Sequence, residues 1–482
     1  MALAVTGAAP ADAPAAARPT APSLAVRRVR AFWAAHRPRG WVLGAMVAGL
    51  TLRLAWTAVA TPRHFELYSD PYEYLSYSHA IAHFQRYTIN GHVTAFFPGG
   101  WPLLLSPSTW LADRTGWFRP ELGASVVTAL IGTFSIGATA HLAALWLGRR
   151  VAVVAAWLVA TAPALIGVTT TPLSETPYTA ALLVLLILVS RVIQRPAGQE
   201  PGWKALVGFG VFVGYVMLIR SSGLTMLPLA GLLLAVRRRS LRPVARAAPW
   251  VVAGSLLVLA PMAAWNWYQI GWLSPFSTNQ AGTVCMGNHD GASGGYVDDP
   301  VFLAQCHWGA PHGVFGLEAK WAGQMPGQAL RWAVHHPDRE YHLTIHKTYL
   351  VLGQDRNAGS ISYLEYLHSI PDGWVGPAWR AIEGWRALAL LLAAAGLIRS
   401  RRLRHAPVLW LTPLSIVMIC WAGAAAGRMN LPVLPFLAIL AATTLVSDAD
   451  EVPDGQGAAP RAVEPGATDP TASTPASTGA PA

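Results

Sequence analysis

Long apolar runs alternate with short, arginine-rich connections along most of the chain. Ten runs between Trp41 and Val446 have the length and apolar content of helices that cross or enter a bilayer. The expected helices are 41–60, 122–147, 150–169, 174–193, 203–219, 222–236, 247–266, 384–398, 406–424 and 430–446. The pattern therefore predicts an all-α polytopic membrane protein with about ten transmembrane helices.

The basic residues predict how these helices are oriented. With the N-terminus inside, 21 of the 35 Lys and Arg residues fall in cytoplasmic connections and tails. The short connections on the opposite side carry only Arg220 and Arg428. We therefore expect a multi-pass protein of the cell membrane with both termini cytoplasmic. Within the membrane module, 41–446, two large extracytoplasmic segments are expected, 61–121 and 267–383.

Composition supports a membrane protein and excludes a soluble domain or a nucleic-acid-binding protein. The 482 residues are 53% hydrophobic and 12% charged, whereas soluble domains carry about 25% charged residues. The net charge of +11 does not indicate nucleic-acid binding, because the arginines cluster between apolar runs. The ends 1–40 and 447–482 are expected to be disordered cytoplasmic tails. The bias toward Arg over Lys, together with abundant Ala, suggests a bacterial source with a GC-rich genome, for example an actinobacterium.

The first outer segment begins with two carboxylates among tyrosines. Asp70 and Glu73 follow the first membrane helix by about ten residues, with Tyr72 between them. An acid held close to the lipid surface is suited to general-base chemistry. Alternatively, Asp70 caps a helix over 71–84 and Glu73 completes a capping box. The two interpretations are compatible, because a cap also holds its side chain rigidly.

Farther along the same segment, residues 99–111 are apolar but short. Pro102 and Pro107 interrupt the run, so it predicts an interfacial or re-entrant helix rather than a full span. Trp101 is expected at the depth of the lipid headgroups, as a membrane anchor.

Three arginines lie where the membrane makes a charge costly. Arg53 falls within the first helix, where it either extends to the surface or meets a buried partner. Arg220 and Arg428 are expected at outer helix ends and favour an anion site, because guanidinium binds phosphate in a bidentate manner. Glu175, at the outer start of the fourth helix, is an alternative partner for either of them.

The second outer segment is polar and rich in glycine. Asn279 and Asn288 lie in a stretch suited to binding a hydroxylated ligand, although ordinary turns have the same composition. Cys285 and Cys306 share this oxidising compartment, so a disulfide between them is plausible.

Two histidine pairs have the spacing of neighbours on one helix face. His79 and His83, and likewise His342 and His346, are four residues apart, a spacing that can hold a metal. The sequence fixes no third ligand for either pair. We therefore expect no metal site and no obligatory cofactor.

In their order along the chain, these motifs resemble the GT-C superfamily of membrane glycosyltransferases. The branch is that of protein O-mannosyltransferases and bacterial aminoarabinose transferases, and the resemblance spans roughly residues 45–445. The motifs that carry it are Ser69–Tyr74, Pro98–Leu103, Pro172–Pro177, Arg220–Gly223, Ser277–Asn288, His336-Pro337 with Lys347, and Arg428–Pro435. In the last motif, Asn430 replaces a second arginine that the family often carries.

The resemblance implies an inverting transfer of a hexose or pentose from a polyprenyl-phosphate carrier to a hydroxyl group outside the membrane. It implies Asp70 as the base, supported by Glu73 and Glu175. Arg220, Arg428 and Lys347 would bind the donor phosphate, and Tyr72, Asn279 and Asn288 the substrates. The acceptor would be a lipid, a glycan or a protein of the cell envelope. The alternative is a transporter or flippase for a lipid-linked saccharide. It accounts for the helices but not for acids concentrated in two outer segments.

Overall fold

The computed structural model describes residues 38–67, 69–196, 198–296, 300–306, 315–353 and 371–446. The tail predicted at 447–482 lies outside these ranges, as does the tail predicted at 1–40 except for its last three residues.

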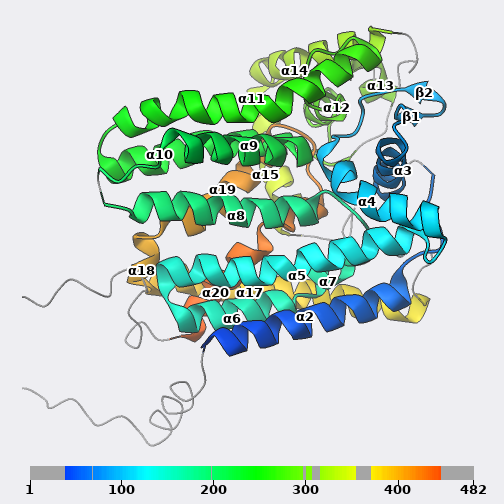
Figure 1. The fold of residues 1–482 in the computed structure, drawn as a ribbon. Coiled ribbons are helices and arrows are strands. Elements are labelled where there is room, and N and C mark those ends of the chain that lie inside the picture. Colours follow the sequence, from blue (N-terminus) through cyan, green and yellow to red (C-terminus); the bar gives the residue numbers. More distant parts are fainter. Residues whose placement is uncertain are drawn as a thin grey trace, which may run out of the picture.

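The core is a bundle of long apolar helices (Figure 1). Each of the ten expected helices corresponds to helical structure. These elements are α2 Pro38–Ala60, α5 Pro120–Leu147, α6 Arg149–Ala160 with α7 Pro163–Gly167, α8 Glu175–Gln194, α9 Trp203–Ile219, α10 Met226–Arg238, α11 Arg242–Ile270, α17 Asp372–Arg399, α19 Pro407–Trp421 and α20 Leu434–Leu445. The 3₁₀ turns η1 Val168–Thr170, η2 Ser221–Thr225 and η3 Gly427–Asn430 lie between them. The predicted all-α class is confirmed for the described residues, whose one sheet is a short hairpin.

Not every helix of the bundle is long enough to span a bilayer. Five of the described helices have the length and hydropathy of a span, and a sixth results if α6 and the bent segment after it are counted together. Three others, α9, α19 and α20, are apolar but shorter. The protein is therefore a polytopic membrane protein, and the number of ten spans stays a prediction.

A proline divides the helix expected at 150–169. Pro163 has no backbone N–H and its ring excludes the carbonyl four residues earlier, so α6 ends at Ala160. Arg53 of α2 is fully buried beside this end. Its guanidinium donates hydrogen bonds to the carbonyl oxygens of Ala160, at 3.3 Å, and Val159, at 3.4 Å. Arg53 thus has buried partners at a broken helix end and does not extend to the membrane surface.

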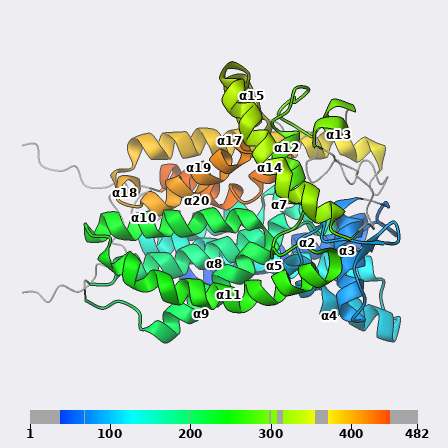
Figure 2. The same ribbon diagram turned by 90° about the horizontal axis from the view of Figure 1, so that it is seen from above.

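The outer segments fold into short elements at one end of the bundle. They are α3 Asp70–Ala82, β1 Thr88–Ile89, β2 His92–Val93, α4 Gly100–Thr115, α12 Asn279–Met286, α13 Pro300–Cys306, α14 Leu317–His335 and α15 Pro337–Leu352. In Figure 1, α3, α4 and the hairpin lie at the right-hand end, opposite α18 Arg401–Arg404. The view from above in Figure 2 separates the same two ends.

The expected interfacial helix is α4, and it is docked against the bundle. A Cβ atom on Gly100 would lie 2.4 Å from the backbone carbon of Leu218 in α9, so only glycine permits this approach. The indole of Trp101 is fully buried and donates a hydrogen bond to the Pro172 carbonyl oxygen at 2.7 Å. Trp101 is therefore not the expected membrane anchor, because its indole packs and donates its N–H inside the protein.

A disulfide closes part of the second outer segment. It joins Cys285 of α12 to Cys306 of α13, the pair that the sequence suggested. Both residues pack in a small core with Phe302 and Met325, so the cross-link ties α12 and α13 to α14.

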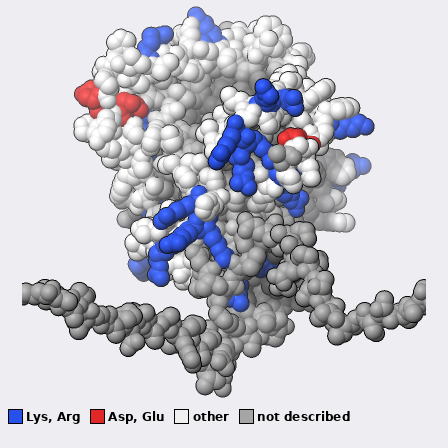
Figure 3. Space-filling model, turned by 90° about the vertical axis from the view of Figure 1, so that its left-hand side faces the viewer, with Lys and Arg blue, Asp and Glu red and all other residues white. Residues whose placement is uncertain are grey.

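The end opposite the outer elements is basic. Figure 3 shows this end of the molecule, where Lys and Arg side chains gather. The helix ends there include the end of α10, with Arg237, Arg238 and Arg239, and the end of α17 with the adjacent α18, with Arg399, Arg401, Arg402 and Arg404. Segregation of positive charge to one end is what the positive-inside rule requires of a cytoplasmic face.

The two ends predict the outcome of topology mapping. In intact cells, a cysteine introduced at the exposed Gly291 should react with an impermeant maleimide, and one at Arg238 should not. Permeabilisation should expose the second site, which controls for its reactivity. The native cysteines do not interfere, because two are paired and Cys420 is buried. Labelling at Arg238 in intact cells would contradict the orientation.

Candidate functional site

A cavity of about 370 Å³ opens where the outer elements meet the ends of the membrane helices. Five of the residues that the sequence proposed for the site line it together. They are Asp70, Glu175, Arg220, Asn279 and Arg428. These residues span more than 350 positions of the chain, so the fold rather than local sequence brings them together. We refer to this space as the outer cavity.

Asp70 enters the outer cavity from the first turn of α3. The helix is capped by Ser69, whose Oγ accepts a hydrogen bond from the Tyr72 backbone N–H at 3.4 Å. The predicted capping role of Asp70 is therefore wrong, because the serine hydroxyl takes it. The carboxylate of Asp70 instead pairs with Arg428, with 2.5 Å between Oδ2 and Nη1.

The second acid joins both arginines. Glu175 Oε1 lies 2.8 Å from Nη1 of Arg220 and 3.6 Å from Nε of Arg428. Ser174, immediately before it, accepts a further hydrogen bond from Arg220 at 3.0 Å. Only 2% of the Glu175 side chain is exposed, against 20–24% for Asp70 and the two arginines. The cavity wall therefore holds two positive and two negative groups, with Glu175 as the inaccessible member.

Glu73 points away from this cluster. Its buried carboxylate accepts a hydrogen bond from the Tyr87 hydroxyl at 2.9 Å, and it does not line the outer cavity. With Ser69 as the cap, Glu73 is the fourth residue of the helix rather than the third, so the predicted capping box is wrong. Burial raises the pKa of the Glu73 carboxyl above its ordinary value, and the Tyr87 hydrogen bond opposes this shift.

Three other proposed site residues lie elsewhere. Tyr72 faces a separate cavity of about 270 Å³ beside His64. Lys347 is fully buried, and its Nζ donates to the Asn288 side chain at 3.0 Å and to the Trp421 carbonyl oxygen at 2.8 Å. Burial lowers the pKa of Lys347, although the adjacent Glu340 opposes this. Lys347 and Asn288 thus connect α15 to the turn after α12 and to the end of α19.

Comparisons with known proteins bear on the family and the fold. Residues 118–267 match the family of dolichyl-phosphate-mannose-protein mannosyltransferases. The fold resembles the apo oligosaccharyltransferase of Archaeoglobus fulgidus, with a TM-score of 0.52, 15% identity, and coverage of 85% of this chain and 50% of that chain. The same protein, AglB, in complex with an inhibitory peptide and a dolichol-phosphate gives a TM-score of 0.51 at 14% identity. That match covers 84% of this chain and 50% of that chain. The fold is that of the GT-C glycosyltransferases.

The predicted resemblance to the GT-C superfamily is thereby confirmed. The chain spans about half the length of the oligosaccharyltransferases that it matches. ArnT from Cupriavidus metallidurans, bound to undecaprenyl phosphate, is a further match, with a TM-score of 0.42, 14% identity, and coverage of 84% of this chain and 78% of that chain. A comparison with curated proteins finds no match.

One residue that joins the segments around the outer cavity was not predicted from the sequence. Glu318 of α14 accepts hydrogen bonds on Oε1 from the hydroxyls of Thr94, at 2.9 Å, and Thr278, at 2.5 Å, and from the Ala95 backbone N–H at 3.2 Å. It thus ties the first outer segment to the loop that leads to Asn279. Its partners are 40 and more than 200 residues away in the sequence, so no local sequence pattern predicts these contacts.

Further polar groups line the cavity; all but Tyr178 fall within the named motifs, yet the sequence assigned none of them a role. They are Tyr74, Tyr178, Ser174, Ser221, Ser222, Ser277, Gln280 and Thr283. Most are adjacent to an acid or arginine of the proposed motifs or lie one helical turn from it. That proximity could have identified them from the sequence, because residues one helical turn apart lie on the same face of the helix.

The buried carboxyl of Glu73 should show in the pH dependence of stability. The folded state keeps this group protonated to a higher pH than the unfolded chain does. Wild-type stability should therefore fall relative to Glu73→Gln as pH rises above about 4.5. Gln retains an oxygen that can accept the Tyr87 hydroxyl, so the two proteins should be alike at lower pH.

Thermal unfolding between pH 4 and 8, compared pairwise, measures this difference. The exposed Glu200→Gln is the control, and its difference from wild type should not vary with pH in this way. A wild type that gains stability relative to Glu73→Gln as pH rises would contradict the assignment.

Proposed function

We propose that the protein is an inverting membrane glycosyltransferase, which moves a sugar from a polyprenyl-phosphate donor to a hydroxyl group on the extracytoplasmic side. One observation carries the proposal. A carboxylate suited to act as a base, Asp70, lies 2.5 Å from a guanidinium suited to bind phosphate, Arg428, in a cavity at the outer ends of apolar helices. The GT-C fold supports the same class of reaction.

The donor phosphate would bind at Arg428, with Arg220 behind it. A cavity of about 370 Å³ falls at the small end of the range typical of ligand sites, which suits a sugar-phosphate headgroup. Apolar side chains line the same cavity, among them Leu224, Ile416 and Ile419. They provide a route along which the prenyl chain would leave the cavity for the membrane.

Donor binding would also release the base. While Arg428 is paired with Asp70, its guanidinium occupies the carboxylate oxygen that would accept the acceptor's proton. A lipid phosphate would exchange with Asp70 as the partner of Arg428, while Glu175 keeps Arg220 in place through their 2.8 Å contact. The site would thus become competent only once its donor is bound.

The reaction would then be a single displacement. Asp70 accepts the proton of the acceptor hydroxyl, and the hydroxyl oxygen attacks the anomeric carbon. The bond between that carbon and the phosphate oxygen breaks, so polyprenyl phosphate leaves with the electron pair. The guanidinium groups of Arg428 and Arg220 stabilise the developing negative charge, so we propose no obligatory cofactor for this step.

Acceptor and sugar would be selected on the aqueous side of the cavity. Asn279, Gln280 and Thr283 line the cavity from α12, and their amide and hydroxyl groups suit sugar hydroxyls. Acceptors of the cell envelope fit this position, whether lipid, glycan or protein.

The sugar can be identified directly. Membranes that contain the protein are incubated with a panel of radiolabelled polyprenyl-phosphate hexoses and pentoses. The expected result is that one label leaves the lipid carrier, and that an Asp70→Asn preparation does not release it. Consumption of no label in the panel would contradict the proposed donor class.

Removal of the base should abolish transfer and spare folding. Asp70→Asn should lower single-turnover transfer by about 10²–10⁴-fold. The helix cap remains, because Ser69 rather than Asp70 provides it. The control is Glu66→Gln, four residues earlier and outside the cavity lining, which should transfer at the wild-type rate. Near-normal transfer by Asp70→Asn would refute Asp70 as the base, and transport of intact donor without transfer would favour a flippase.

A further inference from the structure

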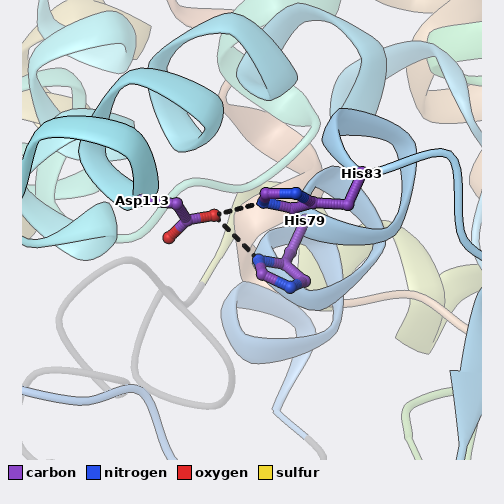
Figure 4. A group of neighbouring side chains, drawn as sticks. All are labelled: His79, His83 and Asp113. Atoms are coloured by element: carbon purple, nitrogen blue, oxygen red, sulfur yellow. Dashed lines mark hydrogen bonds and ion pairs between the residues drawn. The ribbon is translucent and has the colours of Figure 1, made fainter.

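Two helices of the outer end bring a pair of histidines against a carboxylate. His79 and His83 are one turn apart on α3, and Asp113 faces them from α4 (Figure 4). Nδ1 of His79 and Nε2 of His83 each lie 2.9 Å from the same Oδ2 atom of Asp113. Among the residues that the structure describes, this is the one group of three or more His, Cys, Asp and Glu side chains placed to hold a metal ion.

The three ligand atoms are close enough to share one ion. All lie within 4.8 Å of one another, and the two rings are 4.4 Å apart. In a tetrahedral zinc site with bonds of about 2.0–2.1 Å, ligand atoms are about 3.4 Å apart. Small side-chain rotations would therefore open the present contacts enough to admit the ion, with the backbone unchanged.

The scaffold beneath the group is already rigid. One residue before His79, the buried hydroxyl of Ser78 lies 2.5 Å from that of Thr109, one turn before Asp113. This contact fixes α3 against α4 at the level of the three ligands. Binding would therefore cost little reorganisation, which favours affinity.

The group is exposed at the surface of the protein. The side chains of His79, His83 and Asp113 are 49%, 36% and 23% exposed. An ion could enter, and water could supply the remaining ligand. Two neutral imidazoles and one carboxylate carry a single negative charge, and this donor set suits zinc better than magnesium or calcium, which prefer oxygen ligands.

We propose that His79, His83 and Asp113 form a zinc-class metal site, which clamps α3 to α4. The site is separate from the outer cavity, since none of its three residues lines that cavity. It is nevertheless on the helix whose first residue is Asp70. The ion would cross-link the two helices that position this carboxylate and take no part in transfer itself, so the inference is independent of the proposed reaction.

The chain supplies a matched control for this site. His342 and His346 on α15 have the same spacing and are both exposed. In the described part of the chain they belong to no such three-residue group. If histidine spacing alone bound the ion, the two pairs would be equivalent, whereas a site built with Asp113 distinguishes them.

The test uses the full-length chain in nanodiscs, freed of any polyhistidine tag and stripped of metal. Zinc content after equilibration is measured by mass spectrometry, and affinity by competition with a chromophoric chelator. Wild type and His342→Gln/His346→Gln should bind one zinc ion with equal affinity. His83→Gln and Asp113→Asn should each bind at least about tenfold more weakly.

Thermal unfolding separates ligand loss from misfolding. Zinc should raise the unfolding temperature of wild type and of the control, because it binds the folded state, and at the same zinc concentration it should raise that of Asp113→Asn less. Without metal, Asp113→Asn should unfold near the wild-type temperature, since Asn can still accept a histidine hydrogen bond. Equal zinc affinity in wild type and Asp113→Asn would overturn the proposal. So would a loss of zinc affinity in His342→Gln/His346→Gln as large as the loss in His83→Gln.

Discussion

The ion pair between Arg428 and Asp70 is the interaction on which the proposed site depends. Charged groups at the ends of apolar helices are costly unless each has a partner, and here two acids and two arginines provide partners for one another. Glu175 is the fixed member, because it is 2% exposed and contacts both arginines. Arg428 and Asp70 form the accessible pair, so an incoming phosphate would compete for that contact first.

Contacts in the surrounding structure hold Asp70 and Arg428 close to each other. The close approach of α4 to α9 at Gly100 places the first outer segment over the end of α9, from which Arg220 projects. Glu318 joins this segment to the second one. Lys347, bonded to the Trp421 carbonyl oxygen, holds α15 against the end of α19, shortly before Arg428. These contacts are remote in sequence, yet each limits how far Asp70 and Arg428 can separate.

Much of the fold follows from local sequence, whereas the site follows only in part. Hydrophobic runs located every helix of the bundle, and Pro163 changed one of them into two. The acids and arginines of the outer cavity were found because charges next to apolar runs are exceptional. The cap was misassigned because Ser69 and Asp70 are both good caps, and only Arg428 decides between them. Likewise Lys347 resembled a phosphate ligand, and Asp113 was not paired with His79, because tertiary neighbours cannot be inferred from spacing.

Competition between Asp70 and the donor phosphate for Arg428 can be tested by a binding measurement. Polyprenyl phosphate binding to wild type, Asp70→Asn and Arg428→Ala is compared in nanodiscs, without acceptor. If the phosphate displaces Asp70 from Arg428, Asp70→Asn should bind it a few-fold more tightly than wild type, as expected for the loss of a partly exposed ion pair. Arg428→Ala should bind it more weakly. Weaker binding by Asp70→Asn, or unchanged binding by Arg428→Ala, would contradict the exchange.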